Sequence, residues 1–155
     1  MTSTVKDFLT QKDRTVWTID ADSTVYDALV KMSKKGIGAL VVLDKKGKVS
    51  GIFSERDYAR KVVLYGKSSK ESTVSELMTK EITFAKPENS IEECMTLLSK
   101  KHIRHLPVLD GDELVGVITI RDVLKKVIED QQLTIQNLED YIYGRSYGAQ
   151  SYIRE

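Results

Sequence analysis

The sequence predicts an α+β protein built from two copies of one unit, related by a pseudo-two-fold axis. Three segments of the first half recur in the second half at nearly constant distance, 66 residues for the first two (91 − 25 = 66) and 65 for the third (116 − 51 = 65). The pairs are 25–29 with 91–95, 37–44 with 103–110, and 51–57 with 116–122. An internal repeat of this length indicates one supersecondary unit used twice. The missing residue falls near 45–48, Lys-Lys-Gly-Lys, a polar loop that tolerates a deletion.

Each copy opens with the signals of a short helix, a strand and a second helix. Thr4 and Thr73 are each followed three residues later by an acidic residue, the pattern of a capping box. Short β-type runs follow at 16–19 and 82–85. Helices are then expected from residues 25 and 91, because both segments place apolar side chains at i, i+3, i+4 and i+7. The apolar residues are Val25, Ala28, Leu29 and Met32 in the first copy, and Ile91, Cys94, Met95 and Leu98 in the second.

Each copy closes with a hairpin and a last helix, so its order is αβαββα. Buried strands are expected at 39–43 and 106–109, and their antiparallel partners at 49–53 and 114–118, across turns that contain Gly47 and Gly111. The last helix of each copy begins after Ser54 or Thr119. In the second copy it is expected to run on, with one apolar stripe followed by another. These stripes comprise Val123, Leu124, Val127 and Ile128, and then Ile135, Leu138 and Ile142.

The repeats divide the chain into domains at 4–63 and 73–130, separated by a polar linker at 64–72. Residues 131–155 form a helical extension and a tail with no period. Each unit of about 60 residues is marginally stable alone, so the two copies are expected to share a core.

Composition excludes several classes of function. The chain has 155 residues, 24 basic and 23 acidic, for a net charge of +1, so a nucleic-acid binder with a basic face is not expected. A single cysteine, Cys94, cannot form an internal disulfide, which favours a reducing compartment. There is no signal-like start and no apolar run of about 20 residues. We expect a soluble, cytoplasmic protein that does not contact membranes.

The chain repeats one polar pattern, Ser/Thr-x-Arg-Asp, where a strand turns into a helix. The two sets are Ser54, Arg56 and Asp57, and Thr119, Arg121 and Asp122. One interpretation is helix capping alone, with a hydroxyl at the cap and an aspartate in the first turn. The other is a ligand site, since a helix N-terminus binds anions, an aspartate accepts ribose hydroxyls, and arginine holds phosphate. Recurrence in both copies favours the ligand site.

Over about residues 4–130 the chain resembles a pair of cystathionine-β-synthase-type (CBS) domains, known as a Bateman module. The resemblance rests on Val-Ser-Glu-Leu-Met-Thr at 74–79, Ile-Arg-His-Leu-Pro-Val at 103–108, and Gly-hydrophobic-hydrophobic-Ser/Thr-x-Arg-Asp in both copies. It implies a regulatory module that binds an adenine nucleotide, AMP, ADP or ATP and possibly NAD, in two clefts between the repeats. It further implies a homodimer formed through the CBS helices, signalling to an effector protein that the sequence does not identify.

The resemblance also assigns roles to residues. The aspartates hold ribose, the Ser/Thr hydroxyls lie near the first phosphate, isoleucines at 37 and 103 pack on adenine, and Arg104 and His105 reach phosphate. Gly38 and Ala39 cannot reach phosphate, so unequal sites are expected, and a phosphate beside His105 would favour its protonated form. Trp17 is equally explained by core packing. The full set of candidate ligand-binding residues is Trp17, Thr18, Ile37, Gly38, Ala39, Ser54, Arg56, Asp57, Thr83, Phe84, Ile103, Arg104, His105, Pro107, Thr119, Arg121 and Asp122.

Other functions have weaker sequence support. A ligand-independent dimeric scaffold is the alternative, suggested by the helical surface such modules present and by four C-terminal tyrosines at 141, 143, 147 and 152. No catalytic pattern and no catalytic cofactor are indicated, so an enzyme is not expected. The only histidines, His102 and His105, lack further ligands for a metal nearby in sequence. Gly66-Lys67-Ser68 has Lys61 where a P-loop requires glycine.

Overall fold

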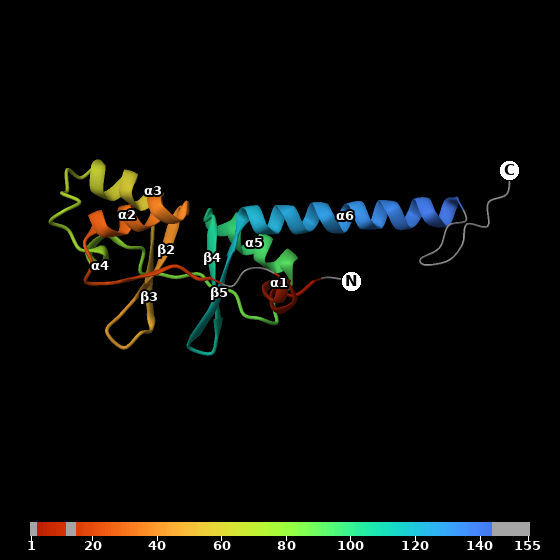
Figure 1. Ribbon diagram of the computed structural model, residues 1–155, viewed down its shortest axis with the longest axis horizontal. Helices are drawn as coiled ribbons and strands as arrows, with labels where there is room; N and C mark the ends of the chain where they lie inside the picture. The colour runs from red at the N-terminus through yellow and green to blue at the C-terminus, as the bar shows by residue number, and fades with distance from the viewer. Residues whose placement is uncertain (1–2, 12–14, 144–155) are drawn as a thin grey trace.

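The computed structural model describes residues 3–11 and 15–143 and contains two small sheets with helices packed on them (Figure 1). In the first copy, β1 (Thr18–Asp20) pairs in parallel with β2 (Ala39–Leu43), which pairs antiparallel with β3 (Val49–Ser54). In the second copy, β4 (His105–Asp110) and β5 (Glu113–Thr119) form an antiparallel pair. This is the α+β repeat architecture expected from the sequence.

The strand expected at 82–85 is absent from the second sheet, and that prediction was wrong. Only Ala85 bridges to Val108. In the first copy the Val41 N–H donates to the carbonyl of Trp17 at 3.4 Å. The position equivalent to Val41 in the second copy is Pro107, which has no N–H to donate to Thr83. The missing donor shortens the strand to a single bridge.

Most helices begin and end where the local sequence places capping residues. The capping box predicted at Thr4 forms with Asp7, but the one predicted at Thr73 was wrong, because the Thr73 hydroxyl makes no cap hydrogen bond to α4 (Val74–Leu77) and contacts the Ser75 hydroxyl at 3.1 Å instead. Helices α2 (Val25–Lys35) and α5 (Ile91–Lys101) begin at the hydroxyls of Thr24 and Ser90, and end at left-handed residues, Gly36 with φ of 64° and His102 with φ of 52°. The last helix differs sharply between copies. In the first it is α3 (Glu55–Asp57) continued by one π-helical segment, η1 (Tyr58–Val63), whereas in the second α6 (Ile120–Ile142) runs for 23 residues.

The opening helices are exchanged between the copies. Helix α1 (Val5–Gln11) buries Val5 and Leu9 in the core of the second copy, and α4 (Val74–Leu77) buries its own apolar residues in the core of the first. Backbone hydrogen bonds fix both exchanges: the N–H of Val5 donates to Asn89, and that of Val74 to Ser23, each at 2.8 Å. Figure 1 shows α1 beside α5. The expected common core is therefore two separate clusters, each completed by a helix of the other copy.

Among the described residues, no helix has the length and apolar character needed to cross a membrane.

Polar contacts also join the two copies directly. Lys48 and Asp112, on the two hairpin loops, form an exposed ion pair at 3.6 Å. The Arg56 guanidinium donates to the carbonyl of His102 at 2.6 Å, across from the start of α3 to the end of α5.

Candidate functional site

A cavity of about 360 Å³ lies between the two repeats. Both copies line it, together with the exchanged helix α1. The lining residues are Leu9, Thr15, Val16, Trp17, Gly36, Ile37, Gly38, Ala39, Leu40, Val41, Ile52, Arg104, His105, Gly116, Val117, Thr119, Ile120 and Arg121. Its volume falls in the range of small-molecule sites, roughly 300–1,000 Å³.

One side of the cavity is apolar and is positioned by the end of α2. After the left-handed Gly36, the chain turns so that the N–H of Ile37 donates to Met32 at 3.1 Å, which directs Ile37 into β2. Trp17, the residue just before β1, also lines the cavity. The Lys35 ammonium sits 4.2 Å from the centroid of the Trp17 ring, a cation–π contact, and Lys31 donates to the carbonyl of Thr18. Trp17 therefore serves both interpretations, since it packs on the first core and also lines the cavity.

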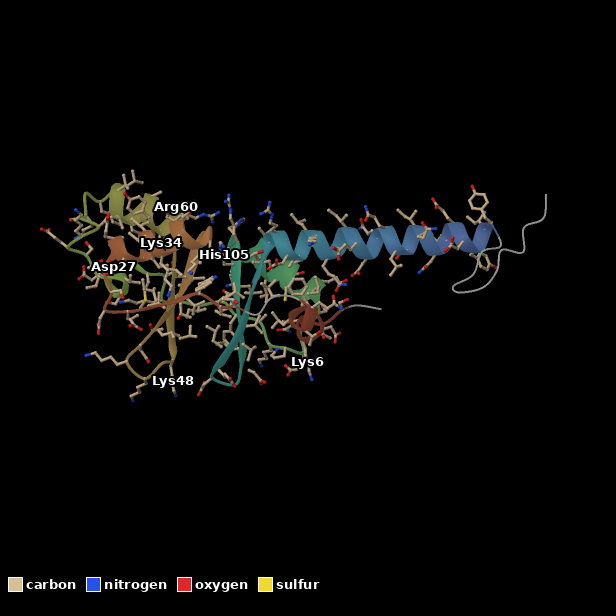
Figure 2. The ribbon with its side chains drawn as sticks, viewed as in Figure 1. Lys6, Asp27, Lys34, Lys48, Arg60 and His105 are labelled. Atoms are coloured by element: carbon tan, nitrogen blue, oxygen red, sulfur yellow. The ribbon has the colours of Figure 1, made fainter. Side chains whose placement is uncertain are left out.

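The basic residues of the cavity lining come from the second copy. Arg104, His105 and Arg121 line it, next to the first turn of α6. The N–H of Ile120 donates to the carbonyl of Arg104 at 2.9 Å, which ties the start of α6 to the start of β4. His105 lies at the boundary between the repeats (Figure 2), and a Cβ built on Gly38 would be 3.6 Å from its Cε1 atom. Burial first, and then Arg104, lower the pKa of His105 below its usual 6.5.

Both Ser/Thr-x-Arg-Asp patterns form capping boxes, as the capping interpretation requires. The Ser54 N–H donates to Asp57 at 3.0 Å and the Thr119 N–H to Asp122 at 2.9 Å. In the first copy the carboxylate is buried and receives further donors. The hydroxyls of Ser54 and Thr79 donate to it at 3.1 and 3.0 Å, and the Lys61 ammonium lies at 3.2 Å.

The lysine equivalent to Lys61 in the second copy makes a different contact. Lys126 pairs with Asp130 at 3.4 Å, away from the capping aspartate. The arginines also differ, because Arg56 donates to the backbone of His102 whereas Arg121 lines the cavity. The two junctions, alike in sequence, are therefore unequal in structure.

The cavity brings together about half of the predicted ligand-binding residues: Trp17, Ile37, Gly38, Ala39, Arg104, His105, Thr119 and Arg121. The others do not line it: Thr18, Ser54, Arg56, Asp57, Thr83, Phe84, Ile103, Pro107 and Asp122. Phe84 is 43% exposed. Sequence reasoning missed Leu9, because the helix exchange has no signal in the first copy alone. It could have found Ile52 and Val117, which occupy equivalent positions of β3 and β5.

Two further features bear on possible chemistry outside the cavity. Cys94 is fully buried on α5, and burial followed by the charge of Glu93 raises its pKa to about 11, so it is an unreactive core thiol at neutral pH. Within 3–11 and 15–143, no three His, Cys, Asp or Glu side chains gather as metal ligands would.

Comparison with known proteins decides the family. The family model of the CBS domain matches residues 5–64 and 74–129, which is most of the chain in two repeats. The chain belongs to the CBS domain family. It is a tandem CBS pair, and such pairs are regulatory modules in general.

Its relatives include other small CBS proteins. A solved structure of a protein with CBS domains from Burkholderia ambifaria is 47% identical and has a TM-score of 0.79, covering 83% of this chain and 96% of that one. The CBS-domain protein ATU1752 from Agrobacterium tumefaciens is 36% identical with a TM-score of 0.75, covering 81% and 93%. CBSX3, a mitochondrial CBS-domain protein of Arabidopsis thaliana, is 38% identical over 79% of this chain.

The chain spans 62% of the length of CBSX3, and 36% and 58% of the lengths of two relatives from Thermofilum pendens and Methanopyrus kandleri. Among relatives that are enzymes, the inosine-5'-monophosphate dehydrogenase of Methanocaldococcus jannaschii matches over only 21% of its length. The CBS pair is therefore a small part of that enzyme. A cyanobacterial CBS-CP12 protein, 30% identical with a TM-score of 0.71, covers 80% of this chain and 67% of that one, and is hexameric. CBS pairs thus occur within oligomers.

Proposed function

We propose that this CBS pair is a sensor that binds an adenine nucleotide, AMP, ADP or ATP and possibly NAD, in the cavity between its repeats. The observation that carries this proposal is the division of the cavity. Trp17 and Ile37 offer an aromatic and aliphatic wall to a planar base. Arg104, Arg121 and His105, which come from the second copy, offer donors to phosphates.

The N-terminus of α6 strengthens the phosphate side. Residues 119–121 line the cavity, and the dipole of a 23-residue helix favours an anion at this end. At the first-copy junction the Arg56 guanidinium already donates to the carbonyl of His102, whereas Arg121 lines the cavity. We therefore expect nucleotide to bind more tightly at the junction with Arg121 than at the equivalent junction with Arg56.

The test is thermal unfolding of the full chain with AMP, ADP, ATP, NAD or S-adenosylmethionine. A ligand at one hundred times its dissociation constant stabilises the folded state by about 2.7 kcal/mol per site, which raises the melting temperature by several degrees. Arg121→Gln should weaken binding at least tenfold. Arg56→Gln, the matched control at the equivalent position, should lower the stability of the free protein and leave the affinity at the cavity unchanged.

The ribose role of the two aspartates is tested in the same assay. Asp122→Ala and Asp57→Ala should each weaken one of two binding events, and unchanged affinity in both variants would rule the role out. If no adenosyl compound shifts the melting temperature of nucleotide-free protein, the sensor proposal fails.

Failure of the sensor proposal would leave the second candidate function, a ligand-independent dimeric scaffold for an effector protein. The observation that favours it is the exposed apolar surface of α6, where Leu124, Ile128 and Leu138 are all at least half exposed. A scaffold would bind its effector equally well with and without nucleotide.

A further inference from the structure

The second half of α6 makes no contact that buries it within the described chain. Every residue from 131 to 143 except Asp140 is exposed, and Figure 1 shows the helix projecting away from both repeats. Helices in proteins owe most of their stability to the packing of an amphipathic face. A projecting helix with large apolar side chains therefore needs a surface to pack against.

The apolar residues of α6 follow a heptad repeat. Ile128, Ile135 and Ile142 are seven residues apart, and so are Leu124, Gln131 and Leu138. These two series interleave at spacings of four and three, as the a and d positions of a coiled coil do. The five apolar members are 50%, 53%, 55%, 57% and 72% exposed, in the order Leu124, Ile128, Ile135, Leu138, Ile142.

We propose that the α6 helices of two copies of this chain pack as a parallel, in-register coiled coil over residues 124–142. The heptad pattern identifies the occupant, because isoleucine at a and leucine at d are the residues that favour two parallel strands. In this arrangement each residue of the seam meets the same residue of the other copy.

Gln131, the polar member of the seam, selects the parallel orientation. In register, its amide faces the identical amide of the other copy, and each supplies both a donor and an acceptor. In an antiparallel pair with the same stripe aligned, Gln131 would face Ile135, since 131 + 135 equals 124 + 142. That arrangement leaves a buried amide without a partner.

The charges of α6 permit self-association. The positions that flank the seam pair Val127 with Gln132 and Thr134 with Glu139 across the two helices, so no like charges meet. Acidic residues such as Asp130 lie on the outer face, where Asp130 pairs with Lys126. The coiled coil uses residues 124–142, which lie beyond the part of α6 that lines the nucleotide cavity.

The first experiment is sedimentation equilibrium of the full chain and two variants. Ile135→Glu places a charge in the seam, whereas Leu133→Glu places the same charge on the opposite face at nearly identical exposure, 55% against 54%. We expect the wild type to dimerise, Ile135→Glu to raise the dimer dissociation constant at least tenfold, and Leu133→Glu to change it less than twofold. A monomeric wild type, or equal effects of the two variants, would overturn the proposal.

The second experiment tests orientation. Under mild oxidation Gln131→Cys should form a disulfide-linked dimer and Leu133→Cys should not. Residue 131 lies in the seam and meets the same residue of the other copy, whereas residue 133 lies on the opposite face of the helix. Cys94 is fully buried and does not compete. Equal cross-linking of the two cysteine variants, or none at residue 131, would contradict a parallel coiled coil.

Discussion

At two equivalent positions of the repeats, different residues make the cavity lining differ between the copies. Gly38 and Ala39 enter β2, whereas Arg104 and His105 stand at the equivalent positions before and in β4. The small pair leaves room for the His105 ring beside Gly38. The basic pair supplies charge from one copy only. A substitution between the repeats thus converts a symmetric fold into an asymmetric site.

His105 predicts a pH dependence of stability. Burial and Arg104 lower its pKa in the folded state, more than Glu55 and Asp122 raise it. In the unfolded chain the pKa of histidine is about 6.5, so as the pH falls the unfolded state binds a proton at a higher pH than the folded state does. Folding stability should therefore fall as the pH drops below about 6.5, and be fully retained above it. Urea unfolding between pH 5 and 8 measures this dependence.

The control uses the only other histidine. His105→Gln should remove this part of the pH dependence, while His102→Asn, which suits the left-handed φ of 52° at that position, should retain it. The same slope in His105→Gln and wild type would show that other groups cause the loss. A bound phosphate acts in the opposite direction, because a nearby anion favours imidazolium.

At residue scale, the sequence predicted local contacts well and long-range contacts poorly. The capping hydroxyls of Ser54 and Thr119 act within four residues, and their pattern is visible in the chain. The contact of Arg56 with His102 and that of Thr79 with Asp57 join residues 46 and 22 positions apart. No periodicity encodes such contacts, so the sequence alone could not show that Asp57 is already engaged.

Two glycines at equivalent positions allow the exchanged segments to approach the hairpins. Gly51 in β3 faces Met78 and Thr79, after α4, and Gly116 in β5 faces Leu9 of α1. A Cβ on Gly51 would contact the Met78 Sδ and lie 2.9 Å from the Thr79 carbonyl oxygen. A Cβ on Gly116 would lie 2.7 Å from one methyl carbon of Leu9. Both distances are shorter than a Cβ atom tolerates from a non-bonded neighbour. The neighbours differ, however, in how freely they can move.

Gly51→Ala should destabilise the protein more than Gly116→Ala. The backbone at Thr79 is held by two hydrogen bonds with Ile52, at 2.9 and 3.0 Å, and cannot retreat, whereas the end of the Leu9 side chain can change rotamer. Overpacking of a fixed neighbour costs about 1–3 kcal/mol, and Gly116→Ala should cost less. Midpoints of urea unfolding for the two variants give the comparison. A larger loss for Gly116→Ala would mean that α1 is held more rigidly than α4.

At the scale of elements, the repeat predicted what both copies share. Helices α2 and α5 begin and end at equivalent residues, and the two hairpins carry the expected strands. The repeat could not predict where the copies differ. Pro107 removes a ladder donor and shortens one strand, and the exchange of α1 and α4 depends on which core each helix reaches, which identical capping signals do not specify.

The whole molecule places a ligand site and an assembly surface on one helix. The first turn of α6 lines the cavity through Thr119, Ile120 and Arg121, and its far end carries the heptad seam to Ile142. Over 23 residues the helix is about 34 Å long. A change in the direction of α6 at the cavity is therefore amplified at the seam, where two copies must stay in register.

This arrangement predicts coupling between nucleotide and assembly. If nucleotide binds one orientation of α6 better, it shifts the population toward that orientation and changes the dimer dissociation constant. Linkage then requires dimerisation to change nucleotide affinity by the same factor, commonly 5- to 150-fold. Sedimentation with and without nucleotide gives the first factor, and titration of wild type against Ile135→Glu gives the second. If both ratios are equal and differ from one, nucleotide binding and dimerisation are coupled through α6. If neither nucleotide changes the dimer dissociation constant nor dimerisation changes the nucleotide affinity, the cavity and the seam act independently.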